Sequence, residues 1–376
     1  GYGGPQVPRL SKEYDADYVY HFAAGLDGAG PADDRLDGAG GQLPRIIPFN
    51  EHGERICCGK KNGVCRTGNT RCRVLLKAEK ENHQQPSYTL FKARKNDPIC
   101  LAWITVEFPE KTTYGWIGNW GQECGAPWYY SDIHVQNNLG ADKVSCTWLD
   151  SKGEFGLTGL QVHWPEYHSS YKGNGNDAQY YCHSPPALSF FKEPSPRNIY
   201  YWATNPKNIS SKHEVSVYKS GYRRLTPEPC GLREHNGEKQ PDDITKERDR
   251  VDQNTTKQSN DDGQDKKFAF RRSTQKPHLL PRMMVNETRL VKSRALSHRA
   301  TDLCKSPYSV GPSFVSYQER KFCHMANKRL YFFCEDSKEG ECWDDEKHEI
   351  IHKSASGVVR RAANPAVAFT DTLNWG

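Results

Sequence analysis

The amino-acid sequence predicts a mainly β fold, a β-sandwich or irregular antiparallel sheet stapled by disulfides, followed by a small α+β cysteine-rich module. Three observations predict it: short runs with strand periodicity, turn-forming residues between these runs, and thirteen cysteines in 376 residues. Apolar residues at helical spacing are scarce between residues 56 and 230. We therefore expect sheets to carry the core.

The cysteines also predict the compartment. Thiols at this density persist as disulfides in an oxidising environment, so the sequence predicts a secreted, extracellular protein. Because thirteen is an odd number, we expect one cysteine to stay unpaired. The candidates are Cys57, Cys58, Cys65, Cys72, Cys100, Cys124, Cys146, Cys182, Cys230, Cys304, Cys323, Cys334 and Cys342.

Two further features agree with secretion. Sequons predict N-linked glycosylation at Asn208, Asn254 and Asn286. The chain begins at Gly1, and we expect that a signal peptide has been removed before it. The sequence contains no run of about 18 apolar residues, so no transmembrane segment is predicted.

Residues 1–50 are rich in Gly and Pro, and the pentapeptide Leu26-Asp-Gly-Ala-Gly30 recurs at positions 36–40. Glycine and aspartate favour turns and chain entropy over packing. We expect a loosely ordered segment that docks one aromatic piece, Tyr18 to Phe22, onto the domain that follows.

Residues 51–232 are predicted to form the disulfide-rich β domain. Residues 101–108 alternate as a strand does, with Pro109 closing the run. Residues 144–149 and 157–164 flank a Gly-bearing loop and predict a hairpin, in which Leu160, Val162 and Trp164 share one face.

Residues 233–278 contain no Cys, Trp or Tyr and are dense in charged and amide side chains. Such a segment buries too little apolar surface to offset its ordering entropy, so we predict a disordered linker. Arg271-Arg272 near its end is a candidate site for a dibasic protease, and an uncut linker is an equal alternative.

Residues 279–352 are predicted to form the small four-cysteine module. Residues 289–292 predict a strand, and residues 295–303 predict one or two helical turns. Two disulfides are expected among its four cysteines, with three connectivities left open. Residues 353–376, which include a second dibasic pair at Arg360-Arg361, are predicted to be a flexible tail.

The four-cysteine module resembles a known group of proteins. Val310-Gly-Pro-Ser-Phe-Val-Ser316, with Glu319, Phe322-Cys323 and Met325-Ala-Asn-Lys328 between the four cysteines, resembles a module of uncharacterised secreted proteins of filamentous ascomycete fungi. Gly118-Asn-Trp-Gly121, Cys124-Gly-Ala-Pro-Trp-Tyr-Tyr-Ser131 and His163-Trp-Pro165 are similar to the same group. The resemblance implies a location and an origin but no activity.

Two motifs partly match metal-binding patterns, but their flanking residues or spacing do not fit a metal site. His348-Glu-Ile-Ile-His352 matches the zinc-protease pattern, but its charged flanks argue against a buried helix. Cys57-Cys58-x6-Cys65-x6-Cys72 lacks the paired spacing of a zinc site and differs by one residue from the hevein-type chitin-binding core. We predict a disulfide knot there, and no metal or cofactor.

The aromatic cluster of Trp116, Trp120, Trp128, Tyr129 and Tyr130 is the strongest sign of a ligand. We expect Trp116 and Trp120 to be core residues. Gly125-Ala-Pro127 places the next residues at a strand start beside a loop, so we expect an exposed face there. The candidate ligand-binding residues are Trp128, Tyr129, Tyr130 and Asp132.

No nucleophile elbow, phosphate loop or dinucleotide fingerprint is present, so no catalytic residue is predicted. The leading hypothesis is a non-catalytic binding protein at the cell wall or a host interface, with polysaccharide or a host surface component as partner and no nucleic acid. One alternative is a polysaccharide hydrolase using carboxylates such as Glu107, Asp132 and Glu166. Another is a precursor cut at the dibasic pairs.

Overall fold

The computed structural model describes residues 18–25, 39–53, 55–56, 63–66, 70–76, 84–94, 97–137, 140–152, 157–168, 177–194, 196, 199–202, 288–362 and 368–376. This part of the chain is mainly β, as predicted, and is built from several mainly antiparallel sheets. The following predictions lie outside the described residues: Cys57, Cys58 and Cys230, the sequons at Asn208, Asn254 and Asn286, and the linker 233–278 with Arg271-Arg272.

The largest sheet has six strands in the order β5-β1-β7-β10-β9, with β8 paired to β7. Its strands are β1 (Tyr18–Ala24), β5 (Cys72–Leu76), β7 (Ile99–Glu107), β8 (Thr113–Ile117), β9 (Trp128–Asn137) and β10 (Gly140–Leu149). The alternating run at residues 101–108 forms β7 at its centre. Because both faces of this sheet are covered, β1 and nearly all of β7 are buried along their length.

A second sheet of four strands packs on one face of the first, which makes a β-sandwich. Its order is β12-β11-β6-β3, from β3 (Arg45–Phe49), β6 (Tyr88–Lys92), β11 (Gly159–His163) and β12 (Leu188–Phe191). Tyr20 and Phe22 of β1 meet Phe91 of β6 edge to face, with ring centroids 5.8 and 5.7 Å apart. Leu160, Val162 and Trp164 share this core, as the sequence predicts.

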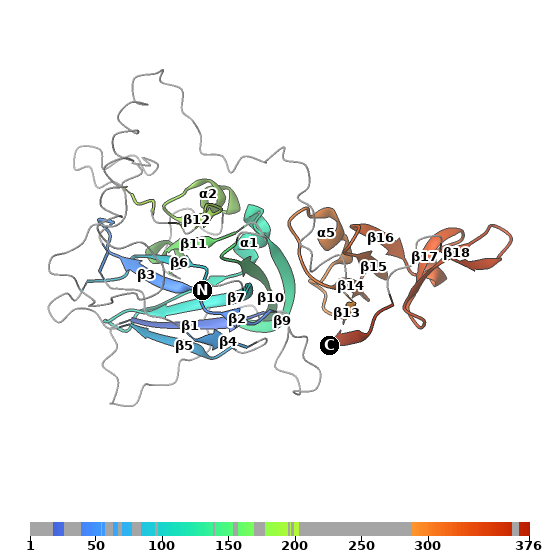
Figure 1. Cartoon of the computed structure of the whole chain (residues 1–376), viewed down its shortest axis with the longest axis horizontal. Helices are drawn as coiled ribbons and strands as arrows, with labels where there is room; N and C mark the ends of the chain where they lie inside the picture. Colours follow the sequence, from blue (N-terminus) through green and yellow to red (C-terminus); the bar gives the residue numbers. More distant parts are fainter. Residues whose placement is uncertain are drawn as a thin grey trace, which may run out of the picture.

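Short elements close the sandwich. Strands β2 (Gly41–Gln42) and β4 (Val64–Cys65) pair with each other. Periodicity did not predict the helices α1 (Asn119–Cys124) and α2 (Ala178–His183) or the 3-10 helix η2 (Trp164–Tyr167). The disulfide Cys124–Cys182 joins α1 to α2 beside the sheets (Figure 1). Trp116 is fully buried and Trp120 packs against the same core, as expected.

The C-terminal module consists of two sheets. The first has the order β16-β15-β14-β13-β20, and the second the order β17-β18-β19. Their elements are β13 (Arg289–Ser293), α5 (Ala300–Lys305), β14 (Ser313–Ser316), β15 (Lys321–His324), β16 (Arg329–Phe332), η3 (Cys334–Asp336), β17 (Gly340–Asp344), β18 (Glu349–Lys353), β19 (Val359–Arg361) and β20 (Asp371–Trp375).

This module packs against the outer face of the six-stranded sheet, beside β9 and β10 (Figure 1). One apolar core runs through the boundary: Trp103, Trp128 and Trp148 of the sheet lie with Phe314 and Trp375 of the module. The module therefore extends the apolar packing beyond the two sheets of the sandwich, at the end that carries β9 and β10.

Five disulfides staple the described residues. Cys65–Cys72, Cys100–Cys146 and Cys124–Cys182 lie in the sandwich, and Cys304–Cys323 and Cys334–Cys342 lie in the module. The expected pairing of the four C-terminal cysteines with one another is confirmed. Their connectivity is first with second and third with fourth.

Two local predictions are wrong, and a third is right only in part. Tyr18 to Phe22 packs onto the β domain as expected, but it does so as part of the inner strand β1, and β3 also precedes residue 51, so the N-terminal segment supplies part of the sandwich core. The predicted hairpin does not form, because β10 and β11 belong to different sheets. The predicted flexible tail contains β20, which pairs in parallel with β13 and buries Trp375. Long-range pairing, invisible to local composition, decides all three.

Candidate functional site

Three neighbouring strands of the four-stranded sheet have a terminal residue at the same edge of the sheet. Phe49 of β3, Tyr88 of β6 and His163 of β11 are cross-strand partners. Two residues beyond Phe49, the turn after β3 carries Glu51, and η2 begins directly after His163 and carries Glu166. Because residues three apart eclipse one another on a 3-10 helix, the local backbone brings Glu166 beside His163.

His163 lies between two carboxylates. Its Nδ1 is 2.6 Å from Oε2 of Glu166, and its Nε2 is 3.0 Å from Oε2 and 3.1 Å from Oε1 of Glu51. The ring of Tyr88 stacks on the imidazole, with centroids 4.1 Å apart. The side chains of His163 and Glu166 are buried, whereas that of Glu51 is 46 % exposed.

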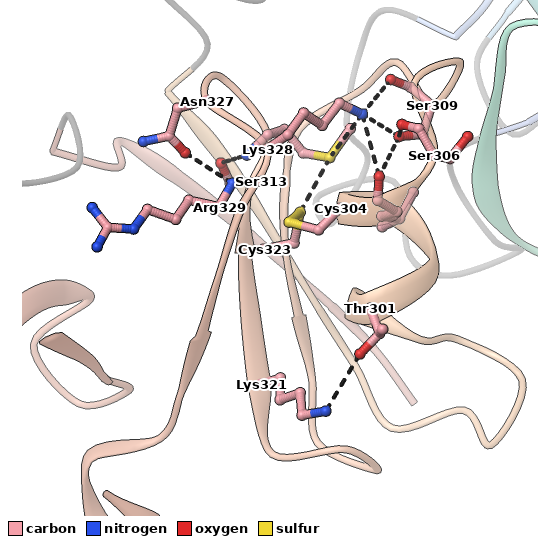
Figure 2. Close-up of a disulfide and its surroundings, with 12 residues drawn as sticks. Thr301, Cys304, Ser306, Ser309, Ser313, Lys321, Cys323, Asn327, Lys328 and Arg329 are labelled. Carbon is pink, nitrogen blue, oxygen red and sulfur yellow. Dashed lines mark hydrogen bonds between the residues drawn. A yellow bond between two sulfur atoms is a disulfide. The ribbon is translucent and has the colours of Figure 1, made fainter. Parts of the chain in front are cut away.

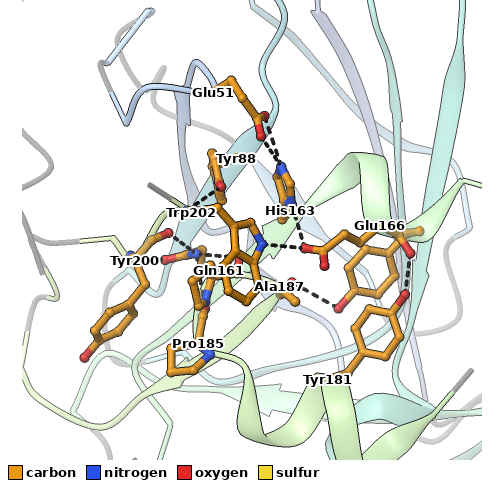
Figure 3. Close-up of polar contacts among 12 residues, drawn as sticks. Glu51, Tyr88, Gln161, His163, Glu166, Tyr181, Pro185, Ala187, Tyr200 and Trp202 are labelled. Atoms are coloured by element: carbon orange, nitrogen blue, oxygen red, sulfur yellow. Dashed lines mark hydrogen bonds and ion pairs between the residues drawn. The ribbon is translucent and has the colours of Figure 1, made fainter. Parts of the chain in front are cut away.

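Glu166 is saturated by further donors. The indole Nε1–H of Trp202 donates to its Oε2 over 3.1 Å, and the hydroxyl of Tyr180 donates to its Oε1. Tyr181 donates to its backbone carbonyl. Figure 3 shows Tyr181 of α2 and Trp202 of the segment 199–202 reaching Glu166 of η2. A buried carboxylate with this many donors is fixed in place.

Gln161 of β11 holds the segment 199–202 against the sheet. Its amide Nε2–H donates to the carbonyls of Tyr200, at 2.8 Å, and Pro186, at 3.1 Å, and its Oε1 accepts from the backbone N–H of Tyr200. The backbone N–H of Trp202 donates to the hydroxyl of Tyr88 over 2.9 Å. These bonds hold Tyr200 and Trp202 beside the site (Figure 3), and Tyr201 lies between them in the sequence.

The carboxylates keep His163 charged. Burial alone would lower its pKa, but the hydrogen bonds to Glu166 and Glu51 outweigh burial and raise the pKa of His163 to about 9. Burial would raise the pKa of Glu51, and the bond from His163 holds it below its ordinary value. At neutral pH the site therefore contains an imidazolium and the ionised carboxylate of Glu51.

The exposed edge of the site is what we name the Glu51 patch: Glu51, Tyr201 and Trp202. Tyr201 and Trp202 are half-buried. Gly53, with a φ of +74°, closes the turn beneath Glu51, and a Cβ at this position would lie 2.7 Å from the ring of Tyr201. The turn that carries Glu51 and the aromatic segment are therefore in contact.

This arrangement does not suit acid–base catalysis. A general base needs a ring nitrogen free to accept a proton, and both nitrogens of His163 face carboxylates. A glycosidase needs two carboxylates with substrate between them, and His163 fills the space between Glu51 and Glu166. The site resembles a rigid support for one exposed anionic group.

The expected exposed face at residues 128–130 is wrong. Trp128 is 1 % exposed, and Tyr129 and Tyr130 are equally hidden. The reason is the module: Trp128 Nε1 donates to Oγ of Ser306, and the hydroxyl of Tyr129 donates to the carbonyl of Pro312. Asp132 is half-buried and forms an ion pair with Lys143.

The other residues singled out in the sequence do not gather at one place. Glu107 pairs with Lys111 at 3.1 Å, and Asp132 with Lys143, so each has its own basic partner. Four histidines lie between residues 134 and 183, and of these His163 is the one held in the carboxylate cluster. The others are His134 and His183, which are exposed, and His168, whose ring contacts Tyr114.

The zinc-protease motif does not lie on a helix. Residues 349–352 belong to strand β18, and His348 sits in the preceding turn with a φ of +53° and stacks on Trp343. Two histidines one helical turn apart are the basis of the motif's metal site, and a strand does not reproduce that spacing. The described residues contain no group of three or more His, Cys, Asp or Glu able to hold a metal ion.

Lys328 of the module is a second unusual group (Figure 2). Burial lowers the pKa of its amine to about 7, and Nζ donates to the carbonyls of Ser309, at 2.7 Å, and Leu303, at 3.3 Å, and to the hydroxyl of Ser309. A Ser–Lys pair can act as a nucleophile and base. Here Ser309 is completely buried, and its hydroxyl donates to the carbonyl of Leu303, so the pair ties the turn before β16 to α5.

Sequence patterns did not single out Glu51, Tyr201 or Trp202. One signal was present: Ile199-Tyr-Tyr-Trp202 is the last aromatic run before a long polar stretch. Glu51 carried no local signal, because its contact with His163 joins residues 112 positions apart.

No family model, curated protein or solved structure matches this chain. The resemblance of the module to secreted fungal proteins therefore stays a prediction. None of the helices in the described ranges has the length and apolar character needed to cross a membrane.

Proposed function

We propose that this is an extracellular, non-catalytic binding protein that holds a saccharide polymer of a cell wall or a host surface through the Glu51 patch. The observation that carries the proposal is a half-exposed, ionised carboxylate on a turn that contacts Tyr201 through Gly53, with Trp202 next along the same half-buried segment. Sugar hydroxyls donate to carboxylates, and the apolar face of a sugar ring packs on aromatic rings.

Pre-organisation supports this role. Glu51 is tied to His163, which is itself fixed by Glu166 and stacked on Tyr88. A ligand that binds a group held in this way does not have to order it first, so less of the binding free energy is lost. The same saturation of His163 and Glu166 favours binding over hydrolysis.

The disulfides support the compartment. Ten cysteines are paired within the described residues, and disulfides persist in oxidising compartments. The two short-range disulfides, Cys65–Cys72 and Cys334–Cys342, hold loops next to strands in place. These features suit a protein that works outside the cell.

The proposal is tested by retention on insoluble chitin, β-glucan and cellulose, with assay of released sugar. We expect the protein to be retained on at least one polymer without releasing sugar. Glu51→Gln and Tyr201→Ala should each reduce retention at least tenfold, because one removes the charge and the other the aromatic face.

Matched controls lie in the module. Glu339→Gln and Phe332→Ala change an exposed carboxylate and an exposed ring away from the patch, and both should bind as the parent does. Thermal melting of every variant separates lost binding from lost folding. Equal retention of the parent and both patch variants would contradict the site, and release of sugar would favour the hydrolase alternative.

A further inference from the structure

No disulfide joins the two halves across the connecting segment. The four cysteines that follow Cys230 pair with one another, as Cys304–Cys323 and Cys334–Cys342. A break in the chain anywhere from residue 231 to residue 303 is therefore not bridged by sulfur. Only non-covalent contacts hold residues 288–376 on the sandwich after such a break.

Those contacts are largely apolar. Trp128, Tyr129 and Tyr130 of β9 are buried against the module, and Phe314 and Trp375 face them from the other side. The ring centroids of Tyr130 and Phe314 lie 5.5 Å apart, and those of Tyr129 and Phe314 lie 6.2 Å apart. A boundary this rich in buried aromatics resembles a permanent interface.

Several polar groups at the boundary form hydrogen bonds across it. Trp148 Nε1 donates to the carbonyl of Val310 over 2.8 Å, and the hydroxyl of Tyr129 donates to the carbonyl of Pro312 over 2.7 Å. The backbone N–H of Val310 donates to the carbonyl of Trp128 over 2.9 Å. Separation would expose the apolar core that these bonds cross, so the bonds and the core act together.

We infer that the face formed by Trp128, Tyr129, Tyr130 and Trp148 is a protein-binding surface whose partner is residues 288–376, and that the two stay bound when the chain between them is cut. Cleavage at a site such as Arg271-Arg272 then gives a two-chain protein and does not release fragments. The inference concerns a different surface from the Glu51 patch, so either can fail without the other.

The experiment uses the full chain with a recognition sequence for a specific protease inserted after Arg272. The folded protein is cut, complete cleavage is verified on a reducing denaturing gel, and the product is analysed by size exclusion and native mass spectrometry. We expect one species containing both fragments. Two separate species at micromolar concentration would overturn the inference.

A variant tests whether the boundary itself holds the pair. A Cβ at Gly311 would lie 2.2 Å from the ring of Tyr129, so Gly311→Ala should raise the dissociation constant of the cut protein at least tenfold. Gly63→Ala has open space at its Cβ and is the control. Circular dichroism of the uncut variants verifies folding. If cut Gly311→Ala and cut Gly63→Ala dissociate alike, the boundary is not what holds the fragments.

Discussion

Trp128→Ala is expected to lower the free energy of unfolding by about 3–5 kcal/mol. The indole is 1 % exposed, lies in the core shared by the six-stranded sheet and the module, and donates to Ser306 across the boundary. Truncation removes buried apolar area and leaves a cavity. A sheet cross-linked by disulfides relaxes little around such a cavity. Denaturant unfolding at neutral pH measures the change.

The control for this loss is Phe332→Ala, because Phe332 is 55 % exposed on β16. Its effect should stay within about 0.5 kcal/mol, as for most surface substitutions. A Trp128→Ala variant as stable as the Phe332→Ala variant would mean that the module does not cover β9 in solution.

His163→Leu is expected to cost about 3–5 kcal/mol at neutral pH, the second large effect. Leucine has a similar size, but its introduction leaves the carboxylate of Glu166 buried beside that of Glu51 with no cation between them. His183→Leu, at an exposed position on α2, is the matched control and should change stability little. Equal effects of the two substitutions would contradict the charged role of His163.

The same site gives a pH dependence with a defined sign. The pKa of His163 rises from 6.5 to about 9 on folding, so its contribution is complete below pH 6.5 and is lost as pH rises through 9. A shift of this size corresponds to about 3 kcal/mol. The pKa of Glu51 is lowered, so its contribution is present above its ordinary pKa and is lost as the solution becomes more acidic. The stability difference between the parent and His163→Leu should shrink between pH 7 and 10.

Local sequence patterns predicted individual strands better than they predicted which strands pair with each other. The alternation of residues 101–108 predicted β7, and the cysteine spacing after residue 300 predicted a self-contained pair of bridges. Strand periodicity depends on which residues face a core, and that information is local. The partner of a strand is not local, which is why β10 and β11 were assigned to one hairpin but belong to two sheets.

The candidate site shows the same limit. His163 and Glu166 were both singled out in the sequence, but not as a pair, because the 3-10 turn that joins them was not predicted. The burial of Trp128 was not predicted either, because the residue that accepts its hydrogen bond, Ser306, is 178 positions away. A loop-proximal aromatic run predicts a binding face only when no other part of the chain covers it.

A binding titration followed residue by residue shows directly whether the Glu51 patch is the ligand face. Indole N–H signals of tryptophan report separately on Trp202 at the patch and on Trp128 and Trp148 at the boundary with the module. On titration with soluble oligosaccharides of the polymer that retains the protein, the signal of Trp202 should shift, and those of Trp128 and Trp148 should stay unchanged. An unmoved Trp202 signal at saturating oligosaccharide would contradict the account.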